Sequence, residues 1–143
     1  MLSQPLPQSI QYALQYLRRT SLKQQGIFRK SGVKTRINKL RNFCEQNPDG
    51  SDFCEYRENS PYDVADLVKM YLRELPEPLM TMRLSGTFTT IFIDVPPQYR
   101  LRALQSAILL LPDENREVLQ TLLFFLSDIA AEKELVSVVA QSC

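Results

Sequence analysis

Apolar residues recur at intervals of three and four along most of the chain, which is the spacing of one face of an α-helix. Prolines precede the first of these runs and begin two later ones, where a missing amide hydrogen costs little. We expect Ser31 to cap the second helix, and the polar stretch that ends at Asn59 to form a loop. The pattern predicts an all-α bundle of about six helices, which cover Leu6 to Arg19, Val33 to Cys44, Pro61 to Leu72, Leu84 to Val95, Pro97 to Leu111 and Asp113 to Ile129.

The same spacing predicts which side chains face the core. In the second helix these include Val33 and Ile37. In the last three helices they are Leu84, Phe88, Ile91, Phe92, Val95, Leu101, Leu104, Ile108, Leu111, Val118, Leu122, Phe125, Leu126 and Ile129.

Length and composition are those of one globular domain: 143 residues, 44% apolar and 23% charged. No apolar run reaches the length of a membrane span, and the first residues lack the layout of a signal peptide. The three cysteines, Cys44, Cys54 and Cys143, are an odd set without a CxxC pair, which favours free thiols in a reducing compartment. We therefore expect a cytoplasmic protein without a transmembrane segment.

The chain contains no histidine, which excludes Ser-His-Asp and Cys-His nucleophile systems and leaves no imidazole for a metal site. Neither GxxxxGK[ST] nor GxGxxG occurs, so no familiar nucleotide cradle is present. We expect neither a cofactor nor a metal site, and the chain is not expected to be a self-sufficient enzyme.

A net charge of +1 conceals an uneven distribution of charge. Residues 1–44 contain nine Lys and Arg and no acidic residue, whereas the remainder carries a balance of −8. Part of this charge can be neutralised between the two halves, but six cations between Arg29 and Arg41 favour an anionic partner surface.

Two segments concentrate the candidate chemistry. The first, Gly26-Ile27-Phe28-Arg29-Lys30-Ser31-Gly32, places Arg29 beside two apolar anchors and between glycines. A surface arginine is usually only solvated, but an always-charged guanidinium on an anchored loop suits the charge of a transferring phosphoryl group. In the second segment, Lys69 and Arg73 share one helical face, and two prolines then end the helix.

At these residues the sequence resembles the RhoGAP domain, the GTPase-activating module for Rho-type GTPases. The matching segments are Gly26 to Gly32, Lys69 to Thr81, and Leu111-Pro112-Asp113-Glu114-Asn115-Arg116. The sequences of the segments from Gln4 to Ile10 and from Pro61 to Asp66 are similar to those of the deleted-in-liver-cancer subfamily. The resemblance covers residues 4–131 and implies an all-helical domain that docks on a GTP-bound Rho-family GTPase.

The resemblance also implies roles for individual residues. Arg29 corresponds to the arginine finger that enters the GTPase pocket. Lys69 corresponds to a lysine that supports the finger loop, and Arg73 to an arginine that helps order it. Pro78 falls on the proline of the docking groove, and Lys30 is grouped with these as a GTPase-binding residue. GTP and magnesium belong to the partner, so this chain needs no cofactor of its own.

The last residues depart from the family pattern. RhoGAP domains continue after the Leu122–Ile129 helix with an Asn-Leu-Ala segment, which is missing from residues 132–143. We therefore expect an incomplete RhoGAP-like domain over residues 4–131, which lacks the last family helices and leaves an apolar face uncovered, and a divergent tail over residues 132–143. The main interpretation is a GTPase activator working through Arg29, and the alternative is an impaired module that docks a GTPase or another partner without activating it. Binding of nucleic acid or an anionic membrane by the basic third is a weaker interpretation, because no aromatic series interleaves its cations.

Overall fold

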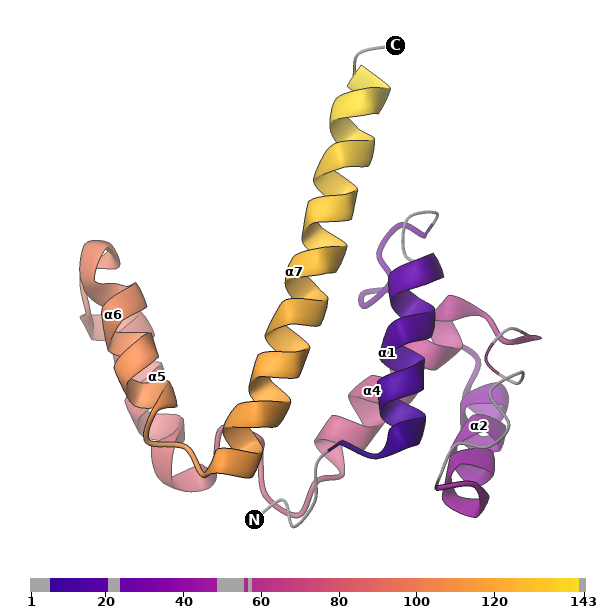
Figure 1. Cartoon of the computed structure of the whole chain (residues 1–143), viewed down its shortest axis with the longest axis horizontal. Helices are drawn as coiled ribbons and strands as arrows, with labels where there is room; N and C mark the ends of the chain where they lie inside the picture. The colour runs from indigo at the N-terminus through magenta and orange to yellow at the C-terminus, as the bar shows by residue number, and fades with distance from the viewer. Residues whose placement is uncertain (1–5, 21–23, 49–55, 57, 142–143) are drawn as a thin grey trace.

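The computed structural model describes residues 6–20, 24–48, 56 and 58–141, and the side chains among them through residue 131. Within these residues lie six helices of at least 12 residues and no strand, which confirms the predicted all-α fold. Tyr56 and Glu58 are also helical, so the loop predicted up to Asn59 is wrong at these two residues. The helices are α1 (Gln8–Thr20), α2 (Lys34–Gln46), α4 (Pro61–Arg73), α5 (Met82–Asp94), α6 (Pro97–Ile108) and α7 (Asp113–Gln141), as Figure 1 shows.

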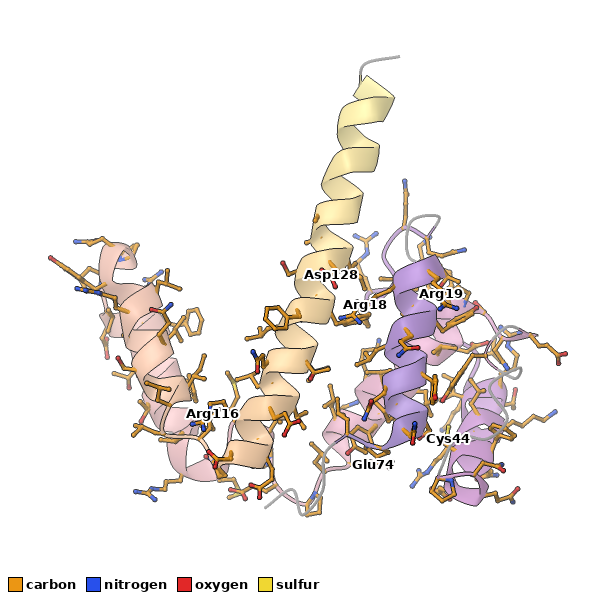
Figure 2. All side chains as sticks on the ribbon, viewed as in Figure 1. Arg18, Arg19, Cys44, Glu74, Arg116 and Asp128 are labelled. Atoms are coloured by element: carbon orange, nitrogen blue, oxygen red, sulfur yellow. The ribbon has the colours of Figure 1, made fainter. Side chains whose placement is uncertain are left out.

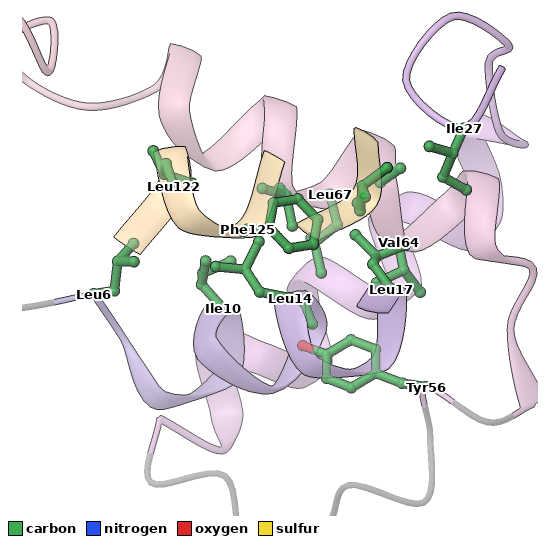
Figure 3. Close-up of a cluster of buried hydrophobic side chains, with 14 of the residues drawn as sticks. Leu6, Ile10, Leu14, Leu17, Ile27, Tyr56, Val64, Leu67, Leu122 and Phe125 are labelled. Carbon is green, nitrogen blue, oxygen red and sulfur yellow. The ribbon is translucent and has the colours of Figure 1, made fainter. Parts of the chain in front are cut away.

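Helix α7 stands between two groups of helices (Figure 1), with α1, α2 and α4 on one side and the α5–α6 hairpin on the other. One face of α7 packs on α1 and α4 and forms the main core with them. Figure 3 shows Phe125 of α7 above Leu14 of α1, with Leu67 of α4 close by. The buried side chains of this core include Ile10, Leu14, Leu17, Ile27, Val64, Leu67, Val68, Val118, Leu122, Phe125 and Ile129.

A second, smaller core lies between α5, α6 and the first turns of α7. It consists of Leu84, Phe88, Ile91, Ala107, Leu111 and Leu119. Leu119 follows Val118 directly, so neighbouring residues of α7 serve different cores. Helix α7 therefore connects the two parts of the fold.

Four residues predicted to face the core are exposed instead: Val33 by 45%, Phe92 by 56%, Leu101 by 68% and Leu126 by 48%. Val33 precedes α2, and Leu126 is turned about 100° around α7 from the buried Phe125. The hairpin has helix neighbours on one side only, so its apolar stripe is wider than the surface that it buries.

Apart from Val33, these exposed side chains are accompanied by other exposed apolar residues on or next to α5, α6 and α7, among them Ile93, Leu109, Leu123 and Phe124. A pocket of about 520 Å³ lies beside it, lined in part by Ile108, Leu119, Leu123 and Phe124. Several large apolar side chains of α5, α6 and α7 are therefore exposed in the described part of the chain, and whether missing helices would cover them stays a prediction.

The long helix α7 continues to Gln141, beyond the end at Ile129 that the apolar pattern predicts. Its backbone shows no break at residue 131, and the divergence of the tail from the family remains a prediction.

Cys44 is a free thiol whose Sγ lies 3.2 Å from the hydroxyl of Tyr56, while Cys54 and Cys143 lie outside the described residues. Among the residues that are described, no helix is both long enough and apolar enough to cross a membrane.

Candidate functional site

The segment from Gln25 to Val33, called the Arg29 loop below, begins with a tight turn. Gly26 has a positive φ of 68°, a conformation that side chains other than glycine rarely adopt. Its carbonyl accepts the N–H groups of Arg29 and Lys30, both at 2.9 Å. The turn closes the backbone under Arg29 and leaves that side chain exposed.

Two apolar side chains seat this turn on the main core. Ile27 is 1% exposed, and the ring of Phe28 meets the ring of Phe125 edge to face, with 5.8 Å between their centroids. Such an arrangement is favourable for aromatic pairs because the positive edge of one ring meets the negative face of the other. The two apolar anchors that the sequence predicts beside Arg29 are therefore present.

Helix α4 binds the backbone on the N-terminal side of the loop through two long side chains. The hydroxyl of Tyr62 donates to the carbonyl of Gln25 at 2.9 Å, and Nζ of Lys69 donates to the carbonyl of Phe28 at 3.2 Å. Lys69 thus contacts the backbone of the loop directly, while its role toward a GTPase stays a prediction.

Two aspartates of α4 bind the C-terminal side of the loop. Asp66 Oδ2 accepts the N–H of Gly32 at 2.8 Å, and Asp63 Oδ1 accepts the N–H of Val33 at 2.7 Å. Helix α2 begins here without a side-chain cap, so the predicted capping role of Ser31 is wrong. Carboxylates from a neighbouring helix take the amides instead, because Gly32 and Val33 lie directly against α4.

Gly32 approaches α4 so closely that no side chain fits. A Cβ on Gly32 would lie 2.8 Å from the Cα of Asp63 and 2.9 Å from its backbone nitrogen, and would also collide with the carboxylate. The absence of a side chain at Gly32 therefore lets the two N–H groups reach the carboxylates.

The carboxylate of Asp66 is held in its ionised form. Partial burial alone would raise its pKa, but hydrogen bonds from Lys69 and from the N–H of Gly32 outweigh that effect, helped by the nearby charges of Lys69 and Arg73. The pKa of Asp66 therefore lies below its ordinary value, and Asp66 also forms an ion pair with Lys69.

Of the five residues proposed from the sequence, Arg29 and Lys30 lie on the Arg29 loop and Lys69 and Arg73 on α4, while Pro78 lies in the turn that follows α4. Arg29 and Lys30 are exposed on the loop, and Nζ of Lys30 lies 5.9 Å from the centroid of the Tyr62 ring. Arg73 donates from Nε to the carbonyl of Lys69 at 3.3 Å. The described hydrogen bond of Arg73 therefore lies within α4. Arg73 influences the loop through its positive charge, which helps to keep Asp66 ionised, and Asp66 in turn binds the N–H of Gly32.

Pro78 is exposed in the turn that follows α4, and its carbonyl accepts the N–H of Thr81 at 2.8 Å. The buried Asn115 of α7 donates from Nδ2 to the carbonyl of Leu79 at 2.9 Å, which ties this turn to the start of α7. The loop and the proline turn are therefore both fastened to helices of the main core.

Sequence reasoning missed Asp63, Asp66 and Asn115 as structural supports of this region. The available signal was the pair of acidic residues three apart on a helix that is otherwise apolar on its inner side. Asp63 is fully buried, and an aspartate in a core stripe requires partners.

Helix α7 is itself fixed to α1 near the loop. Figure 2 shows Arg18 of α1 and Asp128 of α7 facing each other, and Nε of Arg18 lies 3.1 Å from Asp128 Oδ2. The guanidinium of Arg18 also lies over the ring of Phe125, 5.8 Å from its centroid. Phe125, whose ring contacts Phe28 of the loop, is therefore also contacted by Arg18 of α1.

The sequence matches the RhoGAP domain family over residues 7–141, and the chain belongs to that family. Human Rho GTPase activating protein 15 has a similar fold, with a TM-score of 0.79 and 26% identity over 90% of this chain and 60% of that one.

The subfamily follows from more similar relatives. Mouse Rho GTPase-activating protein 7 is 59% identical over 128 residues, which is 90% of this chain and 11% of that protein. Mouse StAR-related lipid transfer protein 8 is 60% identical over 131 residues, which is 92% of this chain and 13% of that protein. Both belong to the deleted-in-liver-cancer subfamily that the sequence resembles. The chain spans about a tenth of the length of these relatives.

Proposed function

We propose that this chain activates Rho-family GTPases by inserting Arg29 into the nucleotide site of the GTP-bound partner. The observation that carries the proposal is the contrast between an exposed arginine and its firmly held backbone. The loop is bound by α4 on both sides of Arg29 and is seated on the main core by Ile27. A preorganised cation needs little reordering when it meets the phosphates.

The guanidinium of Arg29 would neutralise negative charge that develops between the β- and γ-phosphates during hydrolysis. An arginine supplied in this way accelerates hydrolysis by about 10³–10⁵, equivalent to roughly 4–7 kcal/mol of barrier. Lys30, Lys69, Arg73 and Pro78 would contact the GTPase around the loop or support the loop itself. GTP, magnesium and the attacking water would come with the partner.

The test is single-turnover GTP hydrolysis by Rho-type and Rac-type GTPases with an excess of this chain. We compare the natural sequence, Arg29→Ala and Arg83→Ala, since Arg83 is an exposed arginine of α5 outside the Arg29 loop. Acceleration that persists in Arg83→Ala and disappears in Arg29→Ala supports the proposal. Acceleration of equal size in both variants contradicts the role of Arg29.

A second candidate function is docking of a Rho-type GTPase or another partner without activation. Residues 132–143 differ in sequence from the family's Asn-Leu-Ala segment, whose asparagine contacts the GTPase near the finger, and this difference favours docking alone. Equally slow hydrolysis with and without the chain, together with measurable binding of the GTP-bound GTPase, would favour docking alone. For either function we propose the cytoplasm as the compartment, since Cys44 is a free thiol.

A further inference from the structure

Asp63 is a fully buried carboxylate in the first turn of α4. Its Oδ1 accepts the N–H of Val33, and its Oδ2 lies 2.6 Å from Nε of Arg36 on α2. Burying a carboxylate is unfavourable unless it is paired and hydrogen-bonded, and an apolar residue would fill the same space at lower cost. Asp63 is therefore expected to contribute more to the geometry of its surroundings than to the stability of the fold.

That geometry concerns the end of the Arg29 loop. Val33 is four residues from Arg29 and is the last loop residue before α2. The carboxylate connects the backbone of Val33 to α4, while Arg36 connects the same carboxylate to α2. Asp63 thus joins three segments at one point, and Gly32 allows the close approach that this requires.

We propose that Asp63 is a positioning residue for Arg29, and that Arg36 holds the Asp63 carboxylate in place. This inference rests on the proposed function, in which Arg29 reaches into a GTPase. Neither side chain needs to touch the nucleotide. Their effect is to keep the loop backbone on α4, since a displacement of 1 Å at a reacting centre can lower a rate about a hundredfold.

Asp66 performs a different task from Asp63. Its carboxylate is shared between the N–H of Gly32 and the ammonium group of Lys69, so it supports the loop and orients Lys69 at once. Its replacement would mix these two effects. Asp63 and Arg36 therefore give the cleaner test of loop position alone.

The experiment is single-turnover GTP hydrolysis titrated with the chain, which separates the maximal rate from the half-saturating concentration. The variants are Asp63→Asn and Arg36→Gln, and Asp94→Asn is the matched control because Asp94 is an exposed carboxylate at the end of α5. We expect the maximal rate to fall at least about tenfold in both variants, with a half-saturating concentration within about twofold of the natural chain. The control should match the natural chain.

A double variant distinguishes positioning from a separate structural effect. If Arg36 acts through Arg29, then Arg29→Ala with Arg36→Gln is no slower than Arg29→Ala alone. Further slowing in the double variant, or a maximal rate in Arg36→Gln equal to that of the natural chain, overturns the inference. If Arg29→Ala itself has no effect, it is the proposed function that fails.

Amide hydrogen exchange tests the same contact without a GTPase. It uses Arg36→Gln, so the inference can still be tested if Asp63→Asn fails to fold. In Arg36→Gln, we expect the N–H of Val33 to exchange at least about tenfold faster than in the natural chain, while amides in the middle of α4 keep their protection. Unchanged exchange at Val33 would show that Arg36 does not hold this end of the loop, and would overturn the inference independently of any activity.

Discussion

Replacement of Gly32 by alanine tests the close contact between the Arg29 loop and α4. The added Cβ would lie 2.8 Å and 2.9 Å from backbone atoms of Asp63, and real Cβ contacts are essentially never shorter than 3.0 Å. These atoms belong to the first turn of a helix whose inner face is buried, so they cannot swing aside as a flexible side chain would. The loop must move instead.

The expected cost has two parts. Overpacking of a tight site typically destabilises a protein by about 1–3 kcal/mol. Movement of the loop also lengthens the hydrogen bonds that the N–H groups of Gly32 and Val33 donate to carboxylates, and bonds of this kind contribute about 1.5–3 kcal/mol each. Because these bonds lengthen rather than break, only a part of their contribution is lost, and we expect a total loss of about 2–3 kcal/mol. That is a large fraction of the roughly 5–15 kcal/mol that stabilises a typical domain.

Thermal unfolding followed by circular dichroism measures this loss. At about 2–4 °C per kcal/mol, Gly32→Ala should lower Tm by roughly 4–12 °C. Gly86→Ala is the matched control, because a Cβ on Gly86 would meet nothing within 4 Å. In the interior of α5, alanine should stabilise the folded chain by about 0.5–1 kcal/mol relative to glycine, so Tm should not fall. A Tm for Gly32→Ala equal to or above that of the natural chain would refute the reasoning.

Three further outcomes are expected. The pKa of Asp66 is lowered from 3.8 in the folded chain, so its contribution to stability is complete above 3.8 and is lost as the pH falls through the folded pKa. Asp66→Asn should therefore show a flatter decline of the unfolding free energy below about pH 4. An acid profile equal to that of the natural chain would contradict this. Asn115→Ala leaves the carbonyl of Leu79 without its donor and should cost about 1–3 kcal/mol in urea denaturation, so a loss below about 0.5 kcal/mol would be inconsistent with the contact. A dye that fluoresces on apolar surfaces should bind the native chain, and less so after Phe124→Ser, whereas a cooperative melt without dye binding would argue against the exposed face.

The helices could be predicted from sequence because their apolar spacing and their prolines act locally. Pro61 and Pro97 begin α4 and α6 as expected, since a proline in the first turn sacrifices no helical hydrogen bond. The exposure of Leu126 and Leu101 could not be predicted in this way. Periodicity gives the direction of a side chain on its helix, but the packing partner determines whether that side is covered.

The candidate site was predictable only in part. The resemblance identifies Arg29 and Lys69 from their motifs, and the structure places both on or against the same loop. The roles of Asp63 and Gly32 depend on a contact between residues about thirty positions apart, which no local pattern describes. Ser31 illustrates the opposite error, because its local capping signal is overridden by carboxylates from α4.

The contact between Phe28 and Phe125 would couple any binding at the Arg29 loop to the stability of α7, a helix that lies far from the loop in the sequence. A ligand that binds only when the loop is in place also selects molecules in which α7 is docked, since the ring of Phe28 rests on α7. By thermodynamic linkage, the binding energy of such a ligand must appear as greater resistance of α7 to local opening. Amide exchange around Phe125 would then slow when a ligand occupies the Arg29 loop, although Phe125 lies on a different helix.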